Sequence, residues 1–225
     1  MKPDSSTVPA LLVRLERRNG KPKRLPPRTA LDWILWENAA YLVPDERREA
    51  AYATLAKATG LRSEGILGLP RGELREIAAL GGMHPERRVE KLLSIAETVQ
   101  GAFDGDLEAA LDLPLARARR ALKKFPGIGH PGADKILLFT GTHALPALES
   151  NGLRVLVRLG LAQEAKSYST TYRSGVAALA PHAERGARWL MRAHDLLREH
   201  GRALCKHGDP LCDECPLADV CPSAS

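Results

Sequence analysis

Apolar residues recur at spacings of three and four along most of this 225-residue chain, which is the pattern of amphipathic helices. The pattern predicts helices over 31–43, 46–59, 71–80, 86–103, 115–124, 133–140, 152–159, 165–179 and 184–200, and a further helix over 8–17. Short breaks rich in glycine and proline separate them, as at 68–70 and 81–82. No stretch shows sustained period-two alternation with β-branched residues, so the fold is predicted to be all-α.

The composition agrees with a globular helical protein. Hydrophobic residues make up 44% of the chain and aromatic residues only 4%. The longest apolar window, 31–43, contains Asp32, Glu37 and Asn38, and is too short and too polar to span a bilayer. The first residues lack the pattern of a secretory signal peptide. We therefore expect no membrane association and a cytoplasmic, reducing location.

The charge is unevenly distributed. The formal net charge is +6, and residues 117–135 hold six basic residues and one acidic residue, for a local net charge of +5. Such a run is often only a solvated helix face. It also suits a polyanionic partner such as nucleic acid.

All four cysteines lie within 205–221, in the spacing Cys205-x6-Cys212-x2-Cys215-x5-Cys221. A Cys-x2-Cys pair is short for an unstrained disulfide, so one metal centre is the preferred interpretation. Zinc and an iron–sulfur cluster both accept four thiolates. The spacing alone leaves zinc open.

A second motif, Lys123-Lys-Phe-Pro-Gly-Ile-Gly-His-Pro-Gly-Ala-Asp-Lys135, predicts a helix, a tight turn and another helix. Gly127 and Gly129 permit positive φ and a close approach of the backbone to a ligand. Pro131 suits the first turn of the second helix. Amide groups at that helix start can bind an anion such as a DNA phosphate. The alternative is a plain helix–helix corner.

Phe125-Pro-Gly-Ile-Gly129 with Ala133 resembles the helix-hairpin-helix of the endonuclease III-like superfamily of DNA glycosylases. His200-Gly-Arg-Ala-Leu-Cys205 and the cysteines that follow resemble the [4Fe–4S] loop of that superfamily. The resemblance therefore implies a [4Fe–4S] cluster held by Cys205, Cys212, Cys215 and Cys221. Lys206–Leu211, the loop that such enzymes present to phosphates, is less basic here than in the family pattern.

The resemblance implies a two-lobed helical protein with the DNA groove and base pocket between its lobes. A six-helix barrel would span 30–131, and residues 1–29 plus 132–225 would form the iron–sulfur domain with its cluster loop at 205–221. It also implies a monomer that acts on double-stranded DNA, in contact with the nucleoid.

Glu149 falls where the superfamily places a catalytic aspartate. Breaking an N-glycosidic bond develops positive charge on the sugar, and a carboxylate stabilises that charge. Glu149 is one methylene longer than the family residue. The alternative role for Glu149 is to cap the helix that starts near Asn151.

Bifunctional relatives form a Schiff base through a lysine two residues after the last hairpin glycine. Pro131 occupies that position and has no amine, so we expect a monofunctional enzyme that uses water as nucleophile. Lys135, one turn further on, is the alternative amine; a contact with phosphate or solvent is its preferred role.

The remaining DNA contacts implied by the resemblance lie in two segments. Asn38 falls where relatives fill the gap left by an extruded base, although an amide bonded to the backbone is equally compatible. Trp36 and Tyr41 are expected to line the base pocket, or else to pack in the core. The hairpin contacts are expected at Lys123, Lys124, Gly127, Gly129, His130 and Lys135.

These observations predict a glycosylase that excises a damaged or mismatched base. A non-catalytic or damage-sensing DNA-binding protein of the same fold is the alternative, since both catalytic positions depart from the family pattern. The lesion cannot be read from the sequence.

Overall fold

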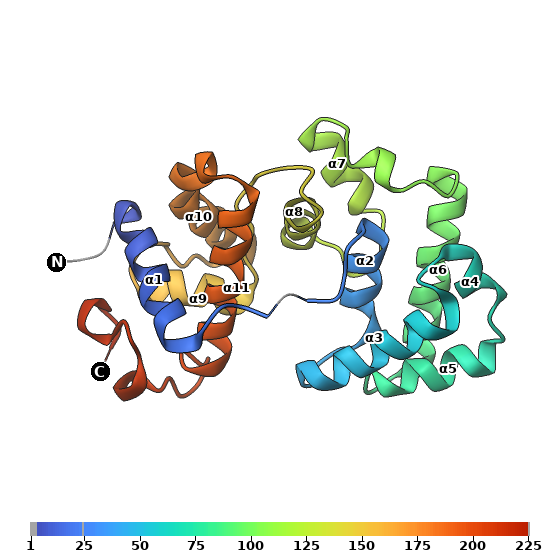
Figure 1. The fold of residues 1–225 in the computed structure, drawn as a ribbon, viewed down its shortest axis with the longest axis horizontal. Coiled ribbons are helices and arrows are strands. Elements are labelled where there is room, and N and C mark those ends of the chain that lie inside the picture. Colours follow the sequence, from blue (N-terminus) through green and yellow to red (C-terminus); the bar gives the residue numbers. More distant parts are fainter. Residues whose placement is uncertain (1–3, 24, 225) are drawn as a thin grey trace. The chain divides into compact units, whose positions relative to one another are not determined.

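The computed structural model describes residues 4–23 and 25–224, and these residues form helices and no strand. The all-α prediction is confirmed. The α-helices are α1 (Val8–Asn19), α2 (Ala30–Ala39), α3 (Asp45–Thr59), α4 (Ser63–Gly68), α5 (Arg71–Leu80), α6 (Pro85–Phe103), α7 (Leu115–Leu122), α8 (His130–Phe139), α9 (Ser150–Arg158), α10 (Tyr168–Leu179) and α11 (Ala187–Ala203) (Figure 1). Short 3₁₀ turns occupy Ser5–Thr7, Glu108–Ala110, Ala180–Arg185, Cys212–Glu214 and Ala218–Val220.

Helix boundaries differ from the predicted ones where capping or backbone geometry intervenes. The predicted helix 31–43 ends at Ala39, because Ala40 is extended and Leu42 has a positive φ of 53°. The predicted helix 165–179 begins at Tyr168, because the Ser167 side chain accepts from the backbone N–H of Thr170. Helix α4 was not predicted, since its six residues are too few to show a helical period.

The chain divides into two compact units. Unit 1 comprises the described residues of Met1–Arg24 and His143–Ser225, and unit 2 comprises Leu25–Thr142. The predicted division at 131 would cut through α8, which packs on α7 and α2 and therefore lies in unit 2.

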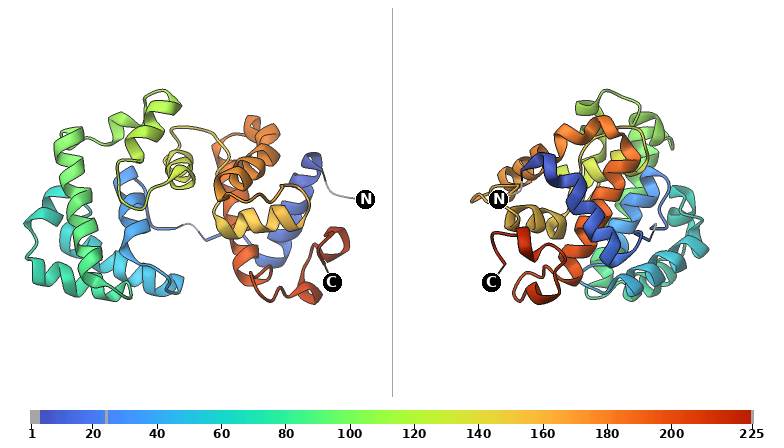
Figure 2. Two further views of the ribbon diagram at one scale, coloured as in Figure 1. Left: turned by 180° about the vertical axis from the view of Figure 1, so that it is seen from behind. Right: turned by 60° about the vertical axis from the view of Figure 1, so that its left-hand side comes forward.

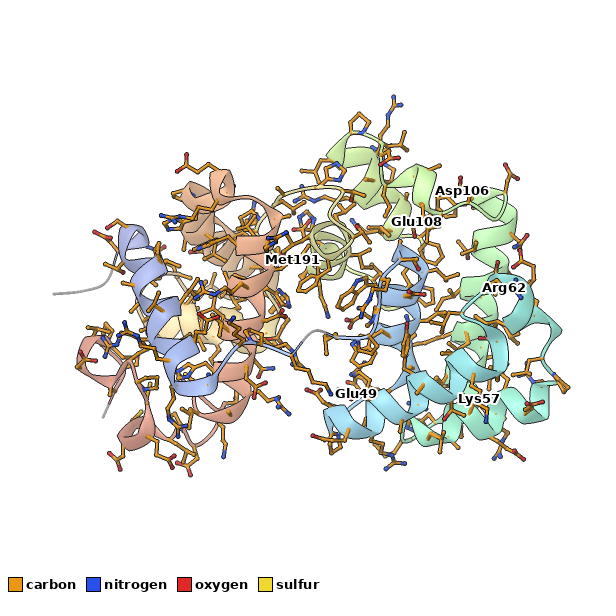
Figure 3. All side chains as sticks on the ribbon, in the orientation of Figure 1. Glu49, Lys57, Arg62, Asp106, Glu108 and Met191 are labelled. Atoms are coloured by element: carbon orange, nitrogen blue, oxygen red, sulfur yellow. The ribbon has the colours of Figure 1, made fainter. Side chains whose placement is uncertain are left out.

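Unit 2 is built around α2 and α6. Helix α2 contacts α3, α6 and α8, and α6 contacts α4 and α5. Trp33, Ile34 and Leu35 of α2 are fully buried. Thr29 and Asp32 form a capping box at the start of α2, and Ala30 donates its N–H to Glu108 Oε1 at 2.7 Å. Figure 3 labels Glu108, which fixes this end of the helix.

Unit 1 joins the two ends of the chain. Helix α1 lies against α11, and α9 lies against both α11 and α10; the view from behind in Figure 2 shows α9 beside α11. Leu11, Leu12 and Leu15 of α1 share one apolar core with residues of α9 and α11, and Cys205, Cys215 and Cys221 pack against that core. Folding of this unit therefore places the cysteine segment directly on helices α9 and α11.

None of the helices in the described ranges combines the length and the apolar character needed to cross a membrane.

Candidate functional site

The helix-hairpin-helix of unit 2 is formed by α7, the turn 123–129 and α8. Gly127 has a φ of +76°, and a Cβ there would lie 3.2 Å from Asn38 Oδ1. The positive φ favours glycine here, and a larger residue would also crowd the Asn38 side chain. Gly129 is extended and is the N-cap of α8, and Pro131 lies in the first turn, where its missing N–H costs nothing.

Asn38 ties α2 to this turn. Its Nδ2 donates to the carbonyls of Ile34 and Pro126, both at 2.9 Å, and the residue is only 6% exposed. Each of its two amide protons thus has an acceptor on the main chain. The side chain therefore holds the hairpin turn against α2 as the structure stands.

The basic run around the hairpin is used in two different ways. Arg119 Nε lies 2.6 Å from Oδ1 of Asp134, a carboxylate with 1% exposed side chain, and His130 Nε2 lies 3.5 Å from the other oxygen. Arg119 is therefore an internal partner that joins α7 to α8. Lys123, Lys124 and His130 are exposed at the turn.

Lys135 is paired within unit 2. Its Nζ lies 2.6 Å from Glu37 Oε1 and 4.7 Å from the centre of the Trp33 ring, and its side chain is 12% exposed. An ammonium held by a carboxylate and an aromatic face is a poor nucleophile and a poor phosphate ligand.

The two aromatic residues expected at the base pocket have different surroundings. Trp36 is 3% exposed and packs edge-on against Tyr52. Tyr41 is 69% exposed and borders a surface groove together with Asn38, Met83 and Arg87. Asn38 and Tyr41 are therefore brought together, whereas Trp36 faces the core.

Glu149 of unit 1 is the N-cap of α9. Its Oε1 accepts from the backbone N–H of Gly152 at 2.8 Å, and its Oε2 accepts from Asn151 Nδ2 at 2.9 Å. The residue is half-buried. The pKa of the neighbouring Tyr168 is raised, first by the burial of Tyr168 and second by the negative charge of Glu149. Because each carboxylate oxygen has a second lone-pair site, capping leaves Glu149 able to interact with a further group.

A chain of hydrogen bonds runs from Glu149 to the cysteine segment. Asn151 Oδ1 accepts from Arg154 at 2.8 Å, and Arg154 Nε donates to the carbonyl of Cys205 at 2.9 Å. Arg154 also donates to the carbonyl of Gly201 at 2.7 Å. A Cβ at Gly201 would lie 2.4 Å from the carbonyl oxygen of Asn151, so α9 and α11 meet backbone to backbone here.

The four cysteines line one cavity between α9, the end of α11 and the C-terminal segment, together with His200 and Arg158. All four are reduced and partly buried. Burial, followed by the other thiols, raises the pKa of Cys215. Among the described residues, no three His, Cys, Asp or Glu side chains converge closely enough to hold a single metal ion.

His200 is the buried polar residue of this cavity. It is 1% exposed, its Nε2 lies 3.6 Å from Cys215 Sγ, and burial lowers its pKa to about 4. A buried imidazole beside a thiol is suited to donate to a thiolate.

Comparisons with known proteins concern the sequence and the fold of the chain. No family model matches the chain. Over 162 residues it is 28% identical to a thymine-DNA glycosylase of Aeropyrum pernix, a match that covers 66% of this chain and 63% of the relative. It is 26% identical over 145 residues to an endonuclease III of Sulfolobus acidocaldarius. This match covers 64% of this chain and 58% of the relative.

Among solved structures, endonuclease III trapped as a covalent intermediate with DNA matches with a TM-score of 0.77 and 17% identity, over 98% of this chain and 96% of the other. A thermostable thymine-DNA glycosylase matches with a TM-score of 0.75 and 15% identity, over 97% and 95%. The predicted resemblance to the endonuclease III-like superfamily is confirmed. The chain has the endonuclease III fold, although its sequence matches span about three fifths of the length of these curated relatives.

Within this endonuclease III-like fold, four residues near the functional groups were not predicted: Asn151, Arg154, Arg158 and His200. Arg154 and Arg158 lie four residues apart in the helix that Glu149 caps, a spacing that places two guanidinium groups on one side of α9. His200 precedes the first cysteine by five residues. The sequence thus contains these spacings, but they indicate a role only once the structure places the cysteine segment against α9 and α11.

Proposed function

We propose that this protein is a monofunctional DNA glycosylase that hydrolyses the N-glycosidic bond of a damaged or mismatched base in double-stranded DNA. The observation that carries the proposal is the carboxylate of Glu149, half-buried at the start of α9 and held by Gly152 and Asn151. It lies in a protein with the endonuclease III fold, and relatives are named for endonuclease III and thymine-DNA glycosylase.

In the proposed reaction the bond between the sugar and the base nitrogen breaks, and its electron pair leaves with the base, which takes up a proton. Glu149 stabilises the positive charge that develops on the sugar. Water then bonds to the sugar carbon and loses a proton to Glu149 or solvent. The hydrogen bonds from Gly152 and Asn151 orient the carboxylate before the substrate arrives.

Two observations support water rather than an amine as the nucleophile. Pro131 has no amine, and Lys135 is paired with Glu37 and covered by Trp33. A Schiff base at Lys135 would require the loss of this ion pair and deprotonation of the ammonium.

For the DNA contacts, we propose that Lys123, Lys124 and His130 with the backbone of Gly127 and Gly129 bind phosphate at the hairpin. Asn38 and Tyr41 share the groove where the strand with the extruded base would lie. Asn38 must exchange its bond to Pro126 to enter the DNA, so Tyr41 is the more accessible of the two.

Cys205, Cys212, Cys215 and Cys221 are proposed to hold a [4Fe–4S] cluster. The donor set fits: four reduced thiols line one cavity, Arg158 donates to one of them, and the His200 imidazole lies within hydrogen-bond distance of another. In a cluster each thiolate binds a different iron, so the four sulfurs need not converge on one point as they do on zinc. These ligands would tie Cys205, just after the end of α11, to the C-terminal segment, and assembly of the cluster would require a reducing compartment. We expect a monomer.

The deciding experiment incubates duplexes carrying single defined lesions with an excess of protein and develops half of each sample with hot alkali. Strand breaks that appear only after alkali support a monofunctional glycosylase and identify the base. Glu149→Gln is expected to lower excision about 100-fold or more while DNA binding persists. Glu199→Gln, a surface carboxylate of the same unit that pairs with Arg202, is the matched control.

Breaks without alkali that disappear in Lys135→Met would instead establish the amine route. Tight DNA binding with no excision from any lesion would favour the non-catalytic alternative.

A further inference from the structure

Two side chains outside the predicted site place nitrogen atoms within hydrogen-bond distance of the cysteine thiols. Arg158 Nη1 lies 3.3 Å from Cys205 Sγ, and His200 Nε2 lies 3.6 Å from Cys215 Sγ. The backbone N–H of Leu217 adds a third donor, 3.4 Å from Cys215 Sγ. The donors are therefore concentrated on two of the four cysteines.

Arg158 is fixed in this position by both arms of the cysteine segment. Its Nη1 donates to the carbonyl of Lys206 at 2.7 Å and its Nη2 donates to the carbonyl of His207 at 2.9 Å. Its own carbonyl accepts from Ser223 Oγ at 3.0 Å. One residue of α9 thus holds the segment on each side of the cavity, and the guanidinium cannot leave Cys205 without breaking these bonds.

His200 has no comparable structural use. It is 1% exposed, and its Nδ1 has no hydrogen-bond partner among the described residues. Its Nε2 lies next to Cys215 Sγ. An incompletely paired polar group in the interior costs stability and calls for an explanation. A thiolate carries no proton. Beside a ligated Cys215, the imidazole must therefore hold its proton on Nε2 and donate a hydrogen bond to the sulfur.

We infer that Arg158 and His200 tune the cluster by donating hydrogen bonds to two of its thiolate ligands, Cys205 and Cys215. The inference rests on the proposed [4Fe–4S] cofactor. Hydrogen bonds to cluster sulfurs stabilise negative charge, and the reduced cluster carries one more electron than the oxidised one. The two donors therefore favour the reduced form and raise the reduction potential. They also slow the loss of iron, because groups behind metal ligands strengthen binding.

The test removes each donor and then returns it. Arg158→Met and His200→Met keep a side chain of similar length without a donor, whereas Arg158→Lys and His200→Gln keep an N–H. Arg202→Met, at the exposed Arg202–Glu199 pair on α11, is the matched control. Iron per chain, the visible absorption, the midpoint potential and the rate of iron release to a chelator are measured on each purified protein without DNA.

We expect both methionine variants to have a more negative midpoint potential and to release iron roughly tenfold faster than the wild type. The lysine and glutamine variants should recover part of each effect, and Arg202→Met should match the wild type. If a methionine variant does not fold, Arg158→Lys and His200→Gln supply the measurement, because each shifts a donor rather than removing it.

Midpoint potentials and iron-release rates that stay unchanged in the methionine variants of an iron-loaded protein would overturn this inference and leave the proposed cofactor intact. A wild-type protein that binds zinc, or no metal, would overturn the proposed cofactor and this inference with it. Neither result would affect the excision assay, which tests the proposed activity independently.

Discussion

Asn151 links the proposed catalytic carboxylate to the cysteine segment through the two ends of a single amide. Its Nδ2 donates to Glu149 and its Oδ1 accepts from Arg154, which in turn holds the carbonyl of Cys205. A side chain used in this way is a positioning residue: it fixes where the Glu149 oxygens lie without contacting the substrate.

Asn151→Ala is therefore expected to slow excision by between about 10- and 100-fold, the range that a carboxylate displaced by about 1 Å accounts for. DNA affinity should change little, because the hairpin and its basic residues belong to unit 2. Single-turnover excision rates and DNA dissociation constants of wild type and variant check this. A loss of DNA affinity as large as the loss of rate would contradict a positioning role and indicate general disruption of unit 1.

At the scale of secondary-structure elements, the hairpin depends on an ion pair between its two helices. Asp134 of α8 is almost completely buried, and its carboxylate is bonded to Arg119 of α7. Removal of Arg119 takes a formal positive charge away from this buried carboxylate, which still has His130 at 3.5 Å.

Arg119→Met is expected to lower the free energy of unfolding by about 3 kcal/mol. Adding Asp134→Asn should restore part of the loss, because the buried carboxylate that has lost its bond to Arg119 is then absent. Urea denaturation of the two single variants and the double variant measures the coupling. A loss below about 1 kcal/mol for Arg119→Met would show that this pair behaves like an exposed one, and Arg119 would then be available to DNA.

At the scale of the whole molecule, the two compact units differ in how the chain builds them. Unit 2 is continuous, from Leu25 to Thr142, whereas unit 1 needs α1 from one end of the chain and α9–α11 with the cysteine segment from the other. A continuous unit with its own buried core is able to fold alone.

The segment 25–142 expressed by itself is accordingly expected to be helical and to unfold in one cooperative transition. The segment 143–225, which lacks α1, is not expected to unfold cooperatively. Far-ultraviolet circular dichroism during thermal unfolding distinguishes the two outcomes. The basis is the burial of Leu11, Leu12 and Leu15 of α1 in the core of unit 1, which 143–225 alone would leave exposed. A stable, cooperative 143–225 segment would contradict this account.

Much of the fold followed from local pattern. The period of apolar residues predicted ten of the helices, and turn chemistry predicted the hairpin at 123–135, because both depend on residues within one or two turns of each other. The sequence also singled out Glu149 and the four cysteines, since residue type and spacing suffice to name a possible carboxylate or ligand set. Helix α4 was not predicted, because its six residues are too few to show the helical repeat of apolar positions.

Only the tertiary structure decided what the polar side chains contact. Asn38 bonds to Pro126, 88 residues away, Lys135 pairs with Glu37 across 98 residues, and Arg154 reaches Cys205 across 51. No local periodicity encodes such partners, because they are set by which helices pack together and at what register. The sequence by itself therefore determined the helices, the hairpin and the possible chemical groups. Packing determined that Lys135 is paired with Glu37, that Asn38 holds the hairpin turn, and that Glu149 is joined by hydrogen bonds to the cysteine segment.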